Sequence, residues 1–307
     1  LRPYNVAPDA MLLNFKSVVM TFTPDRGANL AYVQYDPPLA GVSLPATVAL
    51  NTTAAECGDY RGALKADLSD PLRIRFGGNY PAACGEKVWP VAYADPKTYA
   101  ARTVQGLWES MGGRVLGSVR TGSVPAALLA GKPALVTQSA SLAEVIRDIN
   151  KFSNNVMADQ VFLTLGAQKR GNGNASTAAD TVNAWWRERL PLAEPPLLDK
   201  GSGLSRDARI TAQSLAYLLQ WVWGQGFMPE LMASLPITGL DGTLKRSKSS
   251  AMAHLKTGSL RDVAGIAGFV DTASGKRLVV VAILHHANAN AARPALDAMI
   301  DWAGKQP

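Results

Sequence analysis

Cysteine and histidine are scarce in this chain of 307 residues, which contains two cysteines and three histidines. The spacing of Cys57 and Cys84 matches no zinc or redox motif. His254 lies in an expected strand and His285 and His286 follow another, so neither a metal-ligand spacing nor a Ser-His-Asp triad is indicated. We therefore expect no metal and no other cofactor.

Long hydrophobic runs are also missing. The longest apolar run, Leu278 to Leu284, has the length of a strand and not of a membrane span. The net charge of +7 would suit a polyanionic neighbour such as a cell-wall polymer or lipid headgroups, but a modestly basic surface explains it equally well. Lysine and arginine are scattered and no nucleic-acid motif occurs, so we expect no nucleic-acid partner and, at most, peripheral membrane contact.

Two interpretations of the cysteine pair stay open. Cys57 and Cys84 both lie in loop-like sequence, 55–59 and 82–86, which favours a disulfide if the protein works outside the cytoplasm. The alternative is a pair of buried thiols.

The first part of the chain is expected to be rich in strands. Turns containing Pro, Gly and Asp separate apolar segments, and a helix that follows is ended by two glycines. The expected strands are 12–22, 29–35, 45–51 and 72–76, followed by the helix 99–111 and another strand, 114–120. This part shows no repeat and no catalytic constellation.

Helices are expected to dominate from Ser139 onward. Ser141 and Glu144 form a capping box for a helix that should end near Lys151. The triplet Ser153-Asn154-Asn155 should then lie in the connection to the next helix. The further expected helices are 156–165, 177–190 and 210–223.

The last part of the chain predicts three successive antiparallel strands and a closing helix. The strands are expected within 251–260, 263–270 and 278–284, with a tight turn at 272–275, and the helix at 291–303. Lys256-Thr257-Gly258 falls at the end of the first strand. A cation, a hydroxyl and a glycine on an edge strand are suited to binding an anionic peptide end, because the glycine lets a backbone approach closely.

Each triplet alone is common, but their order along the chain is specific. With helix, Ser-x-Asn, helix and then a strand with Lys-Thr-Gly, the chain resembles serine penicillin-recognising enzymes. The stretches Leu198 to Arg206 and Leu235 to Leu244 make it most similar to the class C low-molecular-mass penicillin-binding proteins, which are D-Ala-D-Ala carboxypeptidases and endopeptidases.

The resemblance implies roles for matching residues. Ser153 would relay a proton to the leaving amine, Asn155 would position the substrate amide, and Lys256 would attract the terminal carboxylate. Thr257 and Ser259 would hydrogen-bond that carboxylate, Gly258 would let the substrate backbone approach, and the Ser259 N–H would supply half of an oxyanion hole. The Gly201–Arg206 loop would lie near the cleft, although it could equally be a turn that caps the following helix.

The chain departs from the family pattern at one motif. No serine here precedes a lysine by three positions, so the Ser-x-x-Lys nucleophile motif is absent. We expect the chain to be the downstream portion of a longer protein, with the nucleophile on a missing segment or a separate N-terminal fragment. The alternative is a relative that has lost catalysis and only binds.

The resemblance also implies a fold and a domain division. We expect an α/β (α+β) transpeptidase- or β-lactamase-like domain, an antiparallel sheet flanked by helices, together with a β-rich accessory domain. Residues 1–110 would form the β-rich inserted domain, 111–137 the return segment of a second accessory domain, and 138–307 the downstream part of the penicillin-binding domain.

The function so implied is that of a periplasmic, or otherwise extracytoplasmic, peptidoglycan D-Ala-D-Ala carboxypeptidase. Endopeptidase activity on cross-links is left open. Stem peptides and β-lactam antibiotics would be its ligands. A serine β-lactamase shares the motifs, but a lone catalytic domain would not need the β-rich residues 1–130. A non-catalytic peptidoglycan-binding module is the third hypothesis.

Overall fold

The computed structural model describes residues 2–133 and 135–307. The chain divides into two compact units, Leu1–Val136 and Thr137–Pro307. Each unit has its own hydrophobic core, and the two are described separately below.

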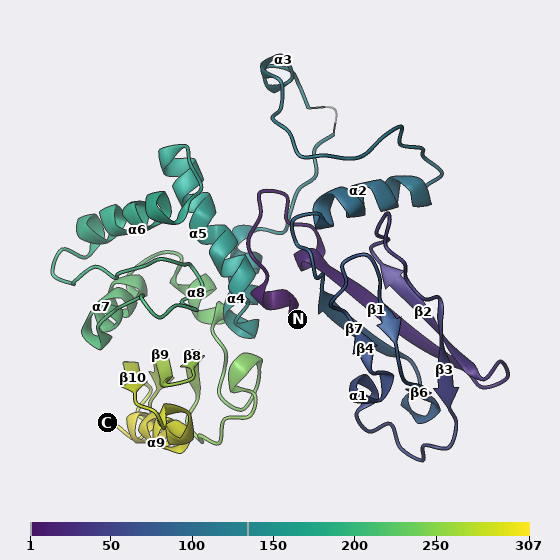
Figure 1. Cartoon of the computed structure of the whole chain (residues 1–307). Helices are drawn as coiled ribbons and strands as arrows, with labels where there is room; N and C mark the ends of the chain where they lie inside the picture. The colour runs from purple at the N-terminus through teal and green to yellow at the C-terminus, as the bar shows by residue number, and fades with distance from the viewer. Residues whose placement is uncertain (1, 134) are drawn as a thin grey trace. The chain divides into compact units, whose positions relative to one another are not determined.

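The first unit is built on a five-stranded sheet with the strand order β6-β3-β2-β1-β7 (Figure 1). Neighbouring strands are antiparallel, except that β3 and β6 run parallel. Alternate residues of β1, such as Val18, Met20 and Phe22, point into the core, as the period of two requires. The strands are β1 (Ser17–Asp25), β2 (Leu30–Asp36), β3 (Thr47–Asn51), β6 (Tyr80–Pro81) and β7 (Lys87–Ala92).

Short elements complete this unit. Tyr99, at the start of helix α2, is fully buried, and its hydroxyl donates to the Ser17 carbonyl at 2.7 Å, which fastens the helix to β1. The helices are α1 (Tyr60–Leu64), α2 (Tyr99–Ser110) and α3 (Ala126–Leu129); the remaining strands are β4 (Ala66–Asp67) and β5 (Arg75–Phe76), and 3₁₀ turns cover Pro3–Asn5, Asn14–Lys16 and Ala82–Cys84.

Three strand predictions in this unit are wrong in part or whole. Of the strand expected over 72–76, only Arg75–Phe76 forms one. The strand expected over 12–22 begins only at Ser17, because Asn14, Phe15 and Lys16 take left-handed φ angles of 40°, 51° and 47° that no strand can contain. The segment 114–120 forms no strand, since it follows Gly112 (φ +85°) as an irregular loop. The predictions over 12–22 and 114–120 relied on apolar runs, which give no information on the left-handed residues that end or prevent a strand.

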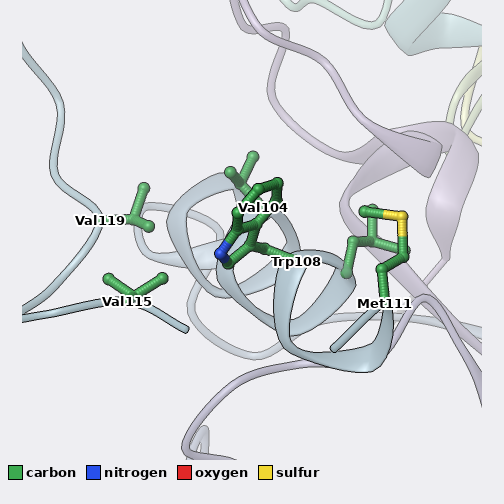
Figure 2. A pocket seen from close by; sticks show the side chains of 6 residues that line it. Val104, Trp108, Met111, Val115 and Val119 are labelled. Atoms are coloured by element: carbon green, nitrogen blue, oxygen red, sulfur yellow. The ribbon is translucent and has the colours of Figure 1, made fainter. Parts of the chain in front are cut away.

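An apolar hollow of about 420 Å³ lies beside α2. Figure 2 shows Trp108 on the helix, with Val115 and Val119 on the loop that passes beside it. The lining residues are Val104, Leu107, Trp108, Met111, Val115 and Val119. None of them carries a titratable or nucleophilic group, so this hollow does not supply catalytic chemistry.

The second unit combines helices with a three-stranded antiparallel sheet of order β10-β9-β8 (Figure 1). Its strands are β8 (Ala253–Leu260), β9 (Val263–Asp271) and β10 (Arg277–His285). Its helices are α4 (Leu142–Phe152), α5 (Asn155–Arg170), α6 (Ala175–Arg189), α7 (Ala212–Trp223), α8 (Met228–Ser234) and α9 (Arg293–Gly304), with 3₁₀ turns η4 (Gly242–Leu244) and η5 (Ala289–Ala292). Among the described residues, no helix is both long and apolar enough to cross a membrane.

Both faces of this sheet are covered by helices. On one face Leu255, Ile266 and Val280 pack with Leu296 and Ile300 of α9. On the other face, Phe269 of β9 and its β10 neighbours pack with Leu219 of α7. The apolar character of successive residues in β9 and β10 follows from this burial on both sides. The predicted antiparallel sheet flanked by helices is confirmed.

Cys57 and Cys84 form a disulfide in the first unit, as the sequence favoured. Cys84 is buried in the core of that unit and Cys57 packs against it. The bond closes a loop with a sequence separation of 27, whose irregular course contains only short elements. Such a link stabilises the folded state mainly by restricting the unfolded chain.

We expect no free thiols in denatured, unreduced protein and two after reduction. Replacing both cysteines by serine should lower the free energy of unfolding by about 3–4 kcal/mol, the chain-entropy contribution of a loop of this length. Thiol titration and urea unfolding measure the two effects. Two free thiols before reduction would show that the bond is absent in solution.

Candidate functional site

The junction between α4 and α5 fixes the position of Ser153. Helix α4 begins with the predicted capping box, in which the Ser141 N–H donates to Glu144 Oε2 at 2.8 Å and the Glu144 N–H donates back to Ser141 Oγ. It ends at Ser153, which takes a left-handed φ of 52° as the C-cap. Asn154 then accepts the Met157 N–H as the N-cap of α5. Ser153 is therefore held by the end of one helix and the start of the next.

Asn155 is the first residue of α5 and is half-buried. The sequence predicts this residue in the connection, with the helix starting at Val156. The helix begins one residue earlier because the Asn154 side chain supplies the cap. Asn155 is thus carried on the first turn of a helix and not on a loop.

Strand β8 presents an open outer edge beside this junction. Its inner edge pairs with β9. On the outer edge, the Leu255 N–H donates to the Pro236 carbonyl at 2.9 Å and the Ala253 carbonyl accepts the Thr238 N–H at 3.1 Å. In the described chain the backbone hydrogen bonds on this edge end at Leu255. Because backbone direction alternates along a strand, the N–H groups of Thr257 and Ser259 point to the same open edge.

Lys256 connects the sheet edge to the helix junction. Its ammonium Nζ donates to Ser153 Oγ at 2.8 Å and to the Thr257 carbonyl at 2.9 Å. Burial lowers the pKa of Lys256 from 10.5 to about 8. The side chain therefore still carries its charge at neutral pH, in a place where that charge is poorly hydrated and interacts strongly with an anion.

The hydroxyl groups of Thr257 and Ser259 each have a hydrogen-bond partner, on the face of the sheet opposite to the Lys256 side chain. The Thr257 and Thr243 hydroxyl oxygens are 2.7 Å apart, and the Ser259 hydroxyl donates to Asn290 Oδ1 at 2.7 Å. The Asn290 amide group in turn donates to the Leu260 carbonyl at 2.7 Å.

Space remains open at Gly258. A Cβ atom placed on this residue would have no neighbouring atom within 4 Å. Gly258 and Ser259 are both exposed. The end of β8 therefore has room for a ligand backbone beside it.

The structure thus brings Ser153 and Lys256 together across 103 residues of sequence and places Thr257, Gly258 and Ser259 along one open strand end. Sequence reasoning missed Thr243 and Asn290. Thr243 lies in the stretch Leu235 to Leu244, which the resemblance had already marked, whereas nothing in the sequence around Asn290 indicates its contact with Ser259.

The loop Gly201–Arg206 is tied to the same strand end. The Ser202 N–H donates to Asp159 of α5 at 2.8 Å, and Arg206 forms an ion pair with Asp262 in the β8–β9 turn. The hydrogen bond from Arg206 lowers the pKa of the Asp262 carboxyl. Helix α7 is capped by Thr211 and not by this loop, so the capping interpretation is wrong.

Comparisons with known proteins identify the family of the chain. A model of the D-Ala-D-Ala carboxypeptidase 3 (S13) family matches residues 2–306. A D-alanyl-D-alanine carboxypeptidase of Actinomadura sp. (strain R39) is 26% identical over 212 residues, which are 66% of this chain and 39% of that protein. A carboxypeptidase DacB of Mycolicibacterium smegmatis is 29% identical over 190 residues, or 57% of this chain and 40% of the relative. The chain spans less than half the length of these relatives.

The fold is shared with a solved structure. Penicillin binding protein 4 (dacB) from Haemophilus influenzae superposes with a TM-score of 0.67 at 19% identity, covering 99% of this chain and 69% of that one. The same protein in complex with a β-lactam gives a TM-score of 0.63 at 17% identity, covering 95% and 70%. At this identity the likeness establishes the fold.

The lowered pKa of Lys256 predicts a pH-dependent contribution to stability. The folded pKa of about 8 lies below the ordinary 10.5, so between these values the unfolded chain binds more protons than the folded one. The free energy of unfolding of the wild type, relative to that of Lys256→Met, should therefore rise as the pH increases through this window. Below about pH 8 the difference should be constant.

Urea unfolding of both proteins on either side of the window measures this difference. Lys276→Met, which removes an exposed ammonium in the β9–β10 turn, is the matched control and should show no such rise. A flat difference for Lys256→Met would mean that Lys256 is solvated like an ordinary surface lysine.

Proposed function

Since the chain belongs to the D-Ala-D-Ala carboxypeptidase 3 (S13) family, we propose that the complete protein hydrolyses the D-Ala-D-Ala end of peptidoglycan stem peptides through an acyl-serine intermediate. The observation that carries the proposal is the Lys256–Ser153 hydrogen bond at the open end of β8. A half-buried cation, a hydroxyl and a free strand edge together match the needs of a peptide with a carboxylate terminus.

We assign Ser153 the role of proton relay. Because its oxygen accepts a hydrogen bond from the Lys256 ammonium, the Ser153 hydroxyl proton is free to be donated to another group. In acyl transfer, the nucleophilic serine attacks the carbonyl of the penultimate residue and the bond to the terminal D-Ala breaks. The lysine of the Ser-x-x-Lys group would take the proton from the nucleophilic hydroxyl. Ser153 would give its own hydroxyl proton to the departing amine and regain one from that lysine, so that the nucleophile's proton ends on the amine. Water then hydrolyses the acyl-serine ester and regenerates the enzyme.

The strand end would bind the substrate. Lys256 supplies positive charge for the terminal carboxylate and Thr257 supplies a hydroxyl donor. The Ser259 hydroxyl, which donates to Asn290 Oδ1, would turn from that partner to donate to the carboxylate. The Ser259 N–H points to the open edge, where it could form half of an oxyanion hole. Asn155, on the first turn of α5, would position the substrate amide. Gly258 leaves the space that the substrate backbone requires.

The proposal places the nucleophile outside these 307 residues. No serine in the chain precedes a lysine by three positions, so the Ser-x-x-Lys group would come from another segment of the complete protein or from a separate polypeptide. The disulfide between Cys57 and Cys84 supports an extracytoplasmic, and in particular periplasmic, location. β-Lactams would acylate the same serine and so act as inhibitors.

Intact-mass analysis after exposure of the complete protein to a penicillin is the test of this function. We expect one stable adduct of the mass of the drug, on a polypeptide that carries the nucleophilic serine. Rapid turnover of the penicillin with no persistent adduct would indicate a β-lactamase. No adduct and no turnover would indicate a binding-only relative.

The role of Lys256 can be tested separately with Lys256→Ala in the complete protein. Losing the charge and the hydrogen bond to Ser153 should slow acylation by penicillin about 100-fold, the usual cost of removing one preorganised electrostatic group. The control Lys276→Ala, which alters an exposed lysine, should react like the wild type. Normal acylation of Lys256→Ala would contradict the assignment of this residue.

A further inference from the structure

The segment Leu235 to Leu244, between α8 and β8, packs directly against the site. Its first residues occupy the outer edge of β8: the Pro236 carbonyl accepts the Leu255 N–H, and the Thr238 hydroxyl accepts the Ala253 N–H at 3.0 Å. The segment therefore has a fixed register relative to the strand that carries Lys-Thr-Gly.

An ion pair between a buried lysine and a half-exposed aspartate ties the same segment to α4. Lys151, whose side chain is only 7% exposed, donates from Nζ to the Leu235 carbonyl and to Asp241 Oδ2, both at 2.6 Å. The other oxygen of Asp241 accepts the Ile237 N–H at 2.9 Å. Burial alone raises the pKa of the Asp241 carboxyl, but the hydrogen bonds from Lys151 and Ile237 outweigh it and leave the pKa below its ordinary value. Since Lys151 is two residues before Ser153, the pair links the segment to the helix that positions the site serine.

Gly242 allows the next residue to reach β8. Its φ is +54°, and a Cβ atom there would lie 2.6 Å from the Lys151 carbonyl oxygen. A larger residue at this position would push the turn away from α4. Leu244 at the end of η4 is buried in the core between α9 and the sheet, which fixes the turn at its other end. Thr243 is held between these two fixed points.

We propose that Thr243 is a positioning residue that orients the Thr257 hydroxyl toward the terminal carboxylate of the ligand. The two hydroxyl oxygens are 2.7 Å apart. A threonine hydroxyl has a single proton, so Thr257 can give it to a carboxylate only if Thr243 is the donor in the bond between the two hydroxyls. When Thr243 donates to Thr257, the Thr257 proton is directed to the ligand, and the two bonds in series strengthen each other.

The exposure of the pair argues against a purely structural role. Thr243 is exposed and Thr257 is only half-buried, so water could satisfy both hydroxyls and their mutual bond contributes little to folding stability. By contrast, the groups that bring Thr243 into place, Lys151 and Leu244, are buried. Rigid support beneath an exposed hydroxyl is the arrangement expected of a ligand-binding group.

The test uses Thr243→Val and Thr243→Ser in the complete protein, with Thr164→Val on the exposed face of α5 as the matched control. Acylation rates are measured with a penicillin and with its methyl ester, in which the carboxylate is masked. Thr243→Val should lose about tenfold toward the free acid, mainly through weaker binding and not through the limiting acylation rate, and should match the wild type toward the ester. Thr243→Ser should restore the rate, and all variants should keep the wild-type Tm.

This inference rests on the proposed function, and a second measurement separates the two. Equilibrium binding of a D-Ala-D-Ala-terminated peptide and of its C-terminal amide is compared in the wild type and in Thr243→Val. If the wild type is not acylated but binds the acid more tightly than the amide, and Thr243→Val abolishes that preference, only the catalytic proposal fails. Equal losses toward acid and amide, or no loss toward either, would overturn the role of Thr243.

Discussion

The hydrogen bond from Lys256 to Ser153 is the contact on which the rest of the site depends. It joins the end of helix α4 to the open edge of β8, two elements separated by 103 residues of sequence. Burial lowers the pKa of Lys256 to about 8 because it removes water from around the ammonium group. The same loss of water strengthens the attraction between this charge and a neighbouring anion. Every role proposed for the surrounding hydroxyls presumes that this cation stays in place.

The charged group and the hydroxyl groups of the site lie on opposite faces of the sheet. Because side chains alternate along β8, Lys256 lies on the face that meets the helix junction, whereas Thr257 and Ser259 lie on the face shared with α9. Charge is thus supplied from one side of the strand and hydroxyl groups from the other. A peptide end lying along the edge of the strand would be within reach of both faces.

Sequence patterns predicted the local elements of the second unit well. The Ser141 capping box, the three strands and the turn between β9 and β10 depend on neighbouring residues, so they can be read directly from the sequence. The contacts of Thr243 with Thr257 and of Asn290 with Ser259 depend on how distant segments pack, and single residues of these types give no signal. The left-handed turn at 14–16 was missed for a related reason, since Phe15 and Lys16 rarely adopt that conformation and nothing in their identity indicates it.

The outer edge of β8 is divided between protein and solvent. The backbone of Pro236 and Thr238 already bonds to Ala253 and Leu255, so a strand from another molecule could pair only with the last few residues of β8. Long exposed edges invite continuous strand addition between molecules, and a shortened edge limits it. The segment Leu235 to Leu244, which positions Thr243 in the site, therefore also reduces edge-to-edge aggregation between molecules. It leaves the last residues of β8 unpaired, a length that suits a short peptide.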